Sequence, residues 1–289
     1  MKNLLLISAS KGYAFSLGSL ILNISKASPG VFDHALVLSD DLTLRDKEII
    51  SEKIPSDFAS YQTPLSKAAR RRSPYLRFFT PHVLAKLEAF RNLNGYQSVT
   101  WLDNDVLVVG PLDTLVAQTP HGASFVSTHL SLGEQFLRKI EGYNLALQAP
   151  AGGTFSIYEN FPEPQSFYTT AMDLAEKFSR DLFLPDQAVL GVAFQTIGLS
   201  WTPLDEEVYA PHPDSATEQA VIHHPFGPRK FWSGQYSEQW NSNYSEWVAL
   251  GGSRISAQAK LREFFRTPVK LEIRARKWID SLCQRFWSR

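Results

Sequence analysis

Two acidic residues interrupt an apolar stretch at residues 98–115. Asp103 and Asp105 lie there between Trp101 and Leu107, and a bounded apolar run of this length is typical of a buried strand. Burying two carboxylates is costly unless a cation compensates them. Residues two apart on a strand point to the same side, so both carboxylates can bind one hard divalent cation. The alternative is a pair of turn carboxylates at a strand end.

Other groups that could complete such a site lie far away in the sequence. His223 and His224 follow an apolar run and would point to opposite sides of a strand, so at most one can face an internal site. A histidine there is more often a core or surface residue, but here two carboxylates are available as fellow metal ligands. Arg77 lies in an apolar segment and could reach an anionic ligand, whereas the basic run 70–72 is typical of a solvated face.

Two further features allow a functional and a structural interpretation. Gly152 and Gly153 precede an alternating apolar segment that predicts a strand. Paired glycines permit a positive φ or a close approach of the backbone to a ligand, and a tight turn without a ligand fits equally well. Asp186 stands at the start of a predicted helix, where its carboxylate could simply cap the first turn.

The elements that must position these groups alternate between strands and helices. Residues 3–9 predict a strand and residues 11–27 a helix, which is the start of a β-α-β unit. A second strand ends at Asp40 and Asp41, which fit a turn and helix cap better than a second metal site. Apolar spacings of three and four after Pro81 predict another helix, and two more follow at 165–182 and from 185 onward. This order predicts an α/β fold.

The composition is ordinary for a soluble globular protein, since 44% of the 289 residues are hydrophobic and 20% are charged. The single cysteine, Cys283, excludes an internal disulfide and suits a reducing compartment. The apolar run at the N-terminus is too short for a signal peptide or a membrane span, so we expect a cytoplasmic location. The net charge is zero, and we expect no nucleic-acid partner.

The charge is unevenly distributed. Residues 254–289 hold ten Lys/Arg and three Asp/Glu, a charge of +7, so residues 1–253 carry −7. Apolar residues including Trp278 recur at spacings of three and four in this tail, with cations on the other side. This pattern favours a helix on an anionic membrane surface, with packing on the acidic body as the alternative. We therefore predict a catalytic domain at 1–252, a basic helical tail at 253–289, and peripheral association with the inner membrane.

Residues 101–115, WLDNDVLVVGPLDTL, resemble the metal-binding motif of glycosyltransferase family 8. This is the family of glycogenin and of bacterial lipopolysaccharide galactosyl- and glucosyltransferases. The resemblance implies that Asp103 and Asp105 hold Mn²⁺, or Mg²⁺, against the diphosphate of a UDP-sugar. The later segment HPFGPRKFW is similar to the family's HxxGxxKPW motif. It implies that His224 is the third metal ligand.

Further motifs extend the resemblance from residue 1 to about residue 232. Gly227 and Lys230, in the histidine motif, would contact the diphosphate. The segment LAKLEAFRNL implies that Lys86 contacts the donor, and PDQAVLG implies that Asp186 and Gln187 lie at the donor sugar and the reaction centre. The remaining expected donor contacts are Tyr13 beside the uridine, Ser8, Ala9, Ser10, Asn104, Gly152 and Gly153, with Arg77 as a further diphosphate contact.

Several positions depart from the family's pattern. The loop after the first strand offers residues 8–10, Ser-Ala-Ser, where the family often has Asp or Asn. Ala151 and Gly191 stand in place of asparagines, and Phe231 replaces a proline. The metal and diphosphate motifs are kept while base and sugar contacts change, so the transferred sugar stays open.

The resemblance implies a GT-A, Rossmann-like α/β fold with a mixed, mostly parallel sheet. It also implies transfer of galactose or glucose, with retention of configuration, from a UDP-sugar to a saccharide or glycolipid such as bacterial lipopolysaccharide. A sugar-nucleotide nucleotidyltransferase is one alternative, although residues 8–18 form a poor glycine-rich basic loop. A non-catalytic nucleotide-sugar binding module is the other. Asp186 and Gln187 fit either a nucleophile or electrostatic support of an oxocarbenium-like state.

Overall fold

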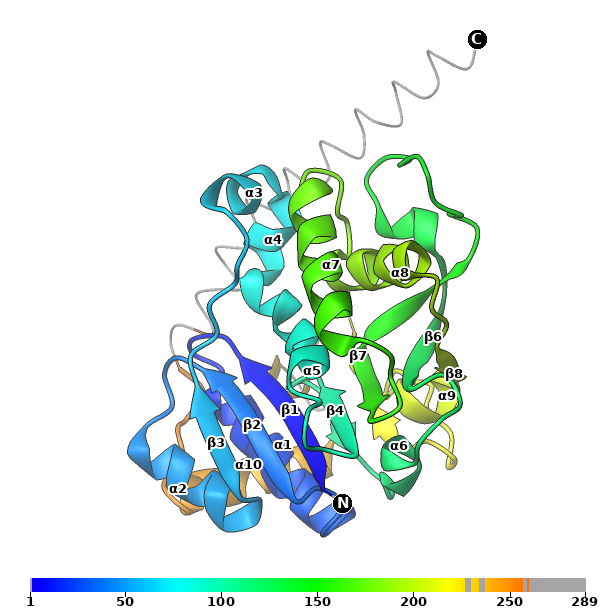
Figure 1. Cartoon of the computed structure of the whole chain (residues 1–289). Coiled ribbons are helices and arrows are strands. Elements are labelled where there is room, and N and C mark those ends of the chain that lie inside the picture. Colours follow the sequence, from blue (N-terminus) through cyan, green and yellow to red (C-terminus); the bar gives the residue numbers. More distant parts are fainter. Residues whose placement is uncertain (1, 227–229, 234–236, 257–258, 260–289) are drawn as a thin grey trace.

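The computed structural model describes residues 2–226, 230–233, 237–256 and 259 (Figure 1). A seven-stranded sheet in the order β3-β2-β1-β4-β7-β6-β8 runs through the middle of the fold. Only β7 is antiparallel to its neighbours, so the sheet is mixed and mostly parallel, as the sequence predicted. Its strands are β1 (Asn3–Ala9), β2 (His34–Ser39), β3 (Ser56–Ala59), β4 (Ser98–Leu102), β6 (Ala123–Ser131), β7 (Gln148–Tyr158) and β8 (Thr202–Leu204).

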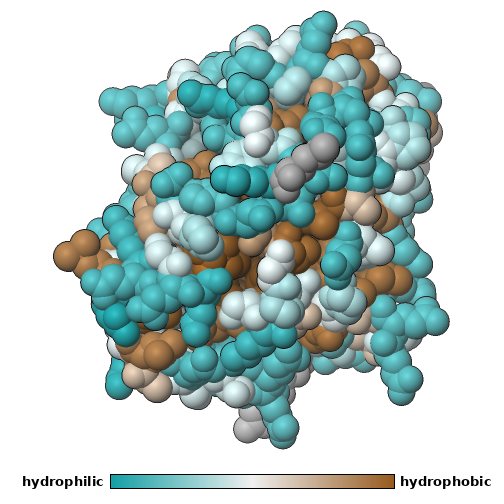
Figure 2. All heavy atoms as spheres, turned by 60° about the horizontal axis from the view of Figure 1, so that its bottom comes forward, coloured by the Kyte–Doolittle hydropathy of each residue, from teal (hydrophilic) through white to brown (hydrophobic). Residues whose placement is uncertain are grey.

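Helices cover both faces of the sheet, and each face has its own apolar core. Alternation along β1 sends Leu4 and Leu6 to one core and Leu5 and Ile7 to the other. The second core packs against α1 (Ala14–Ala27), α2 (Leu44–Lys53) and α10 (Glu238–Ala249), and the first against η1 (Pro81–Leu87), α5 (Glu88–Arg91), α7 (Pro164–Lys177) and α8 (Pro185–Ile197). On the side that Figure 2 presents, hydrophilic residues cover most of the surface, as expected for buried apolar faces.

Short elements connect this framework. They are α3 (Lys67–Arg72), α4 (Pro74–Phe79), α6 (Asp113–Val116), η2 (Leu132–Gln135), α9 (Glu206–Tyr209) and η3 (Phe231–Ser233). Two very short strands, β5 (Leu107–Val108) and β9 (Ile222–His223), pair antiparallel in a separate small sheet. Asn23 of α1 anchors this sheet, because its side chain accepts from the Val108 N–H at 2.6 Å and donates to the Val108 carbonyl at 2.8 Å.

The strand order reverses between β1 and β4. The chain leaves β1 toward β2 on one side and returns to β4 on the other, so the carboxyl ends of β1 and β4 flank a crevice. Open α/β sheets bind ligands in such a crevice. The crevice therefore lies between residues 8–10 and residues 103–105, two segments that contain site residues predicted from the sequence.

Three predicted elements differ in detail. The stretch 98–115 is not one strand: β4 ends at Leu102, and both carboxylates lie in a turn before β5. The helix predicted after Pro81 begins as the 3₁₀ helix η1 and is α-helical only from Glu88. Thr43, rather than Asp40 or Asp41, caps α2, and its side chain accepts the N–H of Asp46 in a capping box.

Most of the predicted basic tail lies outside the described residues, and so does the amphipathic helix expected there. The described part, residues 253–256 and 259, lies against the body, where the Ser253 N–H donates to Asp46 at 2.7 Å and the Ile255 N–H to the Tyr244 hydroxyl at 3.1 Å. Among the described residues, no helix is long and apolar enough to cross a membrane.

We expect Gly18→Ala to destabilise the fold, because Gly18 of α1 lies directly under the fully buried Trp247 of α10. A Cβ at this position would lie 2.4 Å from two carbons of the Trp247 ring. Overpacking of this kind costs about 1–3 kcal/mol, measurable by urea unfolding. Gly110→Ala is the control, since its Cβ would approach no atom closer than 3.4 Å. Equal unfolding midpoints for the two variants would contradict this packing.

Candidate active site

Asp103, Asp105 and His224 come together at the crevice. Each offers one ligand atom, and the three atoms lie within 4.8 Å of one another. His224 Nε2 lies 3.5 Å from Asp105 Oδ1 and 4.0 Å from Asp103 Oδ2. The pairing of β5 with β9 brings the histidine back to the turn that carries both carboxylates. Carboxylate oxygens and an imidazole nitrogen are a donor set that Mn²⁺ accepts, so these residues fit the cation that the sequence predicted.

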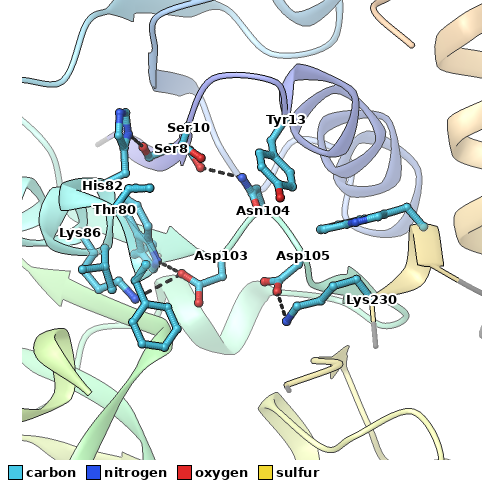
Figure 3. A pocket seen from close by; sticks show the side chains of 14 residues that line it. Ser8, Ser10, Tyr13, Thr80, His82, Lys86, Asp103, Asn104, Asp105 and Lys230 are labelled. Carbon is cyan, nitrogen blue, oxygen red and sulfur yellow. Dashed lines mark hydrogen bonds and ion pairs between the residues drawn. The ribbon is translucent and has the colours of Figure 1, made fainter. Parts of the chain in front are cut away.

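The two carboxylates differ in their charge environment. Lys230 Nζ lies 2.5 Å from Asp105 Oδ2, on the side of the turn facing away from Asp103 (Figure 3). Burial would raise the pKa of the Asp105 carboxyl, but Lys230 and His224 hold it well below its usual range. Burial raises the pKa of Asp103, although Lys86 opposes the shift. Asp105 is therefore the firmly ionised member of the pair.

Lys86 links the cluster of Asp103, Asp105 and His224 to Asp186. Its ammonium group lies 2.6 Å from Asp186 Oδ2, 3.3 Å from Asp103 Oδ1 and 2.7 Å from the carbonyl of Gly152. The side chain is only 3% exposed, so these three acceptors replace its hydration. Burial alone would lower the pKa of Lys86, but the charges of Asp103 and Asp186 raise it, and the ammonium stays charged.

Gly152 and Gly153 are required by close packing around these charges. They lie inside β7 and neither has a positive φ, so a tight turn is not their role. A Cβ on Gly152 would lie 2.1 Å from Asp186 Oδ2, and one on Gly153 would lie 2.7 Å from the His224 ring. The backbone of β7 approaches the side chains of the site itself, so the tight-turn interpretation is wrong and the contact with a ligand remains a prediction.

Two side chains on β4 and its following turn fix the carboxylates. Trp101 Nε1 donates to Asp103 Oδ1 at 2.7 Å, and Asn104 Nδ2 donates to the Ser8 carbonyl at 3.0 Å. The second bond ties the turn to the end of β1 across the crevice (Figure 3). Asn104 was predicted as a donor contact, and it also holds the site together.

The crevice extends from the carboxylates toward the end of β1. Ser8, Ser10, Tyr13 and Asn104 line it together with Asp103, Asp105, Lys86 and Lys230, so eight predicted residues share one cleft. Tyr13 is supported by Trp232, whose ring centroid lies 5.8 Å away. The Gly12 N–H in this turn donates to Asp41 at 2.5 Å, which gives Asp41 a structural role.

Asp186 and Gln187 face a second cleft on the other side of Asp103. Gly153, His224, His129 and Phe226 also line it, and Phe226 is 54% exposed. Asp186 and Gln187 are in the first turn of α8, where Asp186 is held by Lys86 and does not cap the helix with its side chain. Gln187 Oε1 is buried and has no hydrogen-bond partner among the described residues.

Two predicted contacts lie away from the candidate ligands, and a third cannot be placed. The side chain of Ala9 is buried in the core that contains Ile7 and Phe15. Arg77 is exposed on α4 and is not among the residues that line either cleft. Gly227 lies outside the described residues. These three assignments remain predictions.

Sequence reasoning missed three groups that the structure adds. Trp101 precedes Asp103 by two positions on a predicted strand, so the period of two could have placed its ring beside the carboxylate. His82 and Thr80, which also line the first cleft, carried no such signal because η1 was predicted as a regular helix. Thr80 has φ of 69°, a strained conformation for a residue other than glycine.

No protein-family model matches the sequence, and a search of curated proteins gives no match either. Several solved structures, however, have a fold similar to that of this chain. The galactosyltransferase LgtC, in complex with donor and acceptor sugar analogues, is 14% identical with a TM-score of 0.64, over 90% of this chain and 99% of LgtC. This chain thus spans nearly the whole of that enzyme.

Two further glycosyltransferases have a similar fold. The bifunctional WbbM is 14% identical with a TM-score of 0.62, over 86% of this chain and 51% of WbbM. GlyE from Streptococcus pneumoniae TIGR4 is 14% identical with a TM-score of 0.56, over 89% of this chain and 66% of GlyE. The α/β fold implied by the resemblance to glycosyltransferase family 8 is therefore confirmed, and the activity must be argued from the site.

We expect Asp105→Asn to weaken Mn²⁺ binding at least about tenfold, because the amide offers the cation a neutral oxygen in place of a charged one. Isothermal titration calorimetry of the purified protein measures this directly. Asp113→Asn is the matched control, since Asp113 is exposed on α6 in the same stretch of chain. Mn²⁺ affinity at the wild-type value in Asp105→Asn would place the cation elsewhere.

Proposed function

We propose that this chain is a metal-dependent, retaining glycosyltransferase that transfers a hexose, galactose or glucose, from a UDP-sugar to a glycan acceptor. One observation carries the proposal: Asp103, Asp105 and His224 cluster at the strand-order reversal, flanked by Lys86 and Lys230. This arrangement suits a diphosphate leaving group. The fold supports the same assignment, because LgtC shares it and was solved with donor and acceptor sugar analogues.

The charges of the site fit the departure of a nucleoside diphosphate. Bound Mn²⁺, or Mg²⁺, on Asp103, Asp105 and His224 would supply Lewis-acid charge against the diphosphate, and the histidine favours Mn²⁺. Lys230 pairs with Asp105 and can turn its ammonium to the leaving group once that carboxylate binds the cation. Positive charge here stabilises the transition state more than the ground state, because the leaving diphosphate becomes more negative.

Asp186 and Gln187 lie where the sugar would meet its acceptor. Lys86 holds the Asp186 carboxylate in place beside the candidate metal ligand Asp103. A carboxylate on this face can attack the anomeric carbon or stabilise an oxocarbenium-like state, and both routes retain configuration. Gln187 Oε1, which has no hydrogen-bond partner within the described part of the chain, is a ready acceptor for a sugar hydroxyl.

The second cleft is the proposed acceptor site. It adjoins Asp186 and Gln187 on the side away from Ser8 and Tyr13, so donor and acceptor would meet at these two residues. The exposed ring of Phe226 offers an apolar surface to a sugar ring. We propose a lipid-linked bacterial surface saccharide, such as lipopolysaccharide, as the acceptor.

Two other functions would use the same cleft. A nucleotidyltransferase would release inorganic pyrophosphate, and a binding module would bind the nucleotide sugar without turnover. Release of UDP from a UDP-sugar in the presence of Mn²⁺, with a new glycoside as second product, distinguishes the transferase from both. Binding without UDP release would favour the module.

We expect Gln187→Ala to lower kcat for UDP-sugar turnover by about 100-fold, because a polar group in contact with the reacting sugar acts mainly in the transition state. The KM for the donor should stay near wild type, since Gln187 lines the second cleft and is not among the described residues that line the first. Released UDP is the assay. Gln195→Ala, two turns further along α8, is the control and should keep wild-type kcat. A raised KM with unchanged kcat would contradict the assignment.

For the location, we propose a cytoplasmic protein attached peripherally to the inner membrane, with a catalytic domain at 1–252 and a basic tail at 253–289. The charge of the tail supports this, because residues 254–289 carry +7 and anionic lipids attract such segments. The tail would bring the active site to a lipid-linked acceptor.

We expect removal of residues 260–289 to release the protein from phosphatidylglycerol vesicles in a co-sedimentation assay. The truncation keeps Ser253 and Ile255, which contact α2 and α10 respectively. Transfer to a soluble acceptor should be retained, because the site residues all precede the truncation. Undiminished vesicle binding would show that the tail is not the membrane contact.

A further inference from the structure

A serine, a histidine and an aspartate form a chain at the end of the first cleft. Ser8 Oγ lies 2.9 Å from Nδ1 of His82, and Nε2 of the same ring lies 3.6 Å from Asp40 Oδ2. The three residues come from the end of β1, from η1 and from the turn after β2. The fold thus brings together residues that are 74 and 42 positions apart, and the mechanism proposed above uses neither His82 nor Asp40.

The position of Asp40 sets the direction of the hydrogen bond. A carboxylate beside Nε2 favours a proton on that nitrogen, which leaves Nδ1 of a neutral ring as an acceptor. Ser8 must then donate its hydroxyl proton to His82, so the lone pairs of Oγ point away from the ring. Ser60 donates to the other oxygen of Asp40, and the Tyr61 ring packs 5.5 Å from the His82 ring, so the chain is held in place.

Ser8 and His82 both line the first cleft, at the end away from Lys230 (Figure 3). The Ser8 carbonyl accepts from Asn104, which ties it to the turn that carries the metal ligands. If the diphosphate lies at the carboxylates, the nucleoside attached to it extends toward Tyr13 and Ser8. The Ser8 side chain is buried there, with 7% exposure, so an unmatched polar group opposite it would be costly.

We propose that Ser8 recognises the base of the donor nucleotide, because its Oγ accepts a hydrogen bond from the N3–H of uracil. His82 and Asp40 are positioning residues that keep Ser8 Oγ oriented as an acceptor. Uracil has a donor at N3 between two carbonyl acceptors, whereas cytosine has a bare acceptor at N3. An acceptor oxygen therefore matches uracil and repels cytosine, which is how a buried polar group discriminates between analogues. This inference rests on the proposed function, since it assumes that the cleft binds a nucleoside diphosphate.

The test is the ratio of UDP to CDP affinity, measured by calorimetry with Mn²⁺ present. The ratio cancels contributions from the diphosphate, the cation and overall stability, which both nucleotides share. We expect wild type to prefer UDP and Ser8→Ala to lower the ratio about tenfold, through weaker UDP binding. Ser19→Ala, which removes a buried hydroxyl bonded to the Phe15 carbonyl on α1, is the control and should leave the ratio unchanged.

Two variants of His82 separate positioning from packing. His82→Phe keeps a ring but removes the acceptor, so Ser8 loses its orientation and the UDP to CDP ratio should fall. His82→Asn keeps an oxygen near the position of Nδ1 and should restore most of the ratio. An unchanged ratio in both Ser8→Ala and His82→Phe would overturn the inference while leaving the proposed function intact. Absence of any UDP binding by wild type would contradict the proposed function itself.

Discussion

The buried ammonium group of Lys86 is the interaction on which the site depends. It contacts Asp103, Asp186 and the Gly152 carbonyl, so one ammonium group joins the candidate metal ligands, the start of α8 and the middle of β7. Without Lys86, burial of the Asp103 and Asp186 carboxylates would destabilise the fold. A buried charge that has lost its partner costs several kcal/mol. Gly152 has no side chain for the same reason, since a Cβ there would collide with Asp186. The charge arrangement thus dictates the packing around it.

The strand order of the sheet places these charged side chains at a crevice. Because β1 and β4 are neighbours with connections leaving in opposite directions, their carboxyl ends open a crevice without any side chain having to be removed from the core. The small β5-β9 sheet then returns His224 to the two carboxylates across more than 100 residues of sequence. Two clefts meet at Asp103, one extending toward β1 and one past α8, which suits a reaction between two substrates.

The sequence predicted the fold class and most of the residues that meet at the candidate site because the relevant signals are local. The apolar runs and the spacing of Asp103 and Asp105 are readable within a few residues, and resemblance to a known family connected them to His224 and Lys230. Contacts that depend on tertiary packing were not readable. The sequence around Lys86 did not indicate its bond to Asp186, and the sequence around His82 did not indicate its contact with Ser8. The strand expected over 98–115 breaks because the turn at Asn104 is tied to β1.

The most direct test is a crystal structure of the protein soaked with Mn²⁺ and UDP, with anomalous data collected at the manganese edge. We expect one strong anomalous peak between Asp103, Asp105 and His224, with the diphosphate extending from it toward Lys230 and the base lying between Tyr13 and Ser8. A manganese peak elsewhere on the protein, with the three side chains arranged as they are now, would show that these residues are not the cation site.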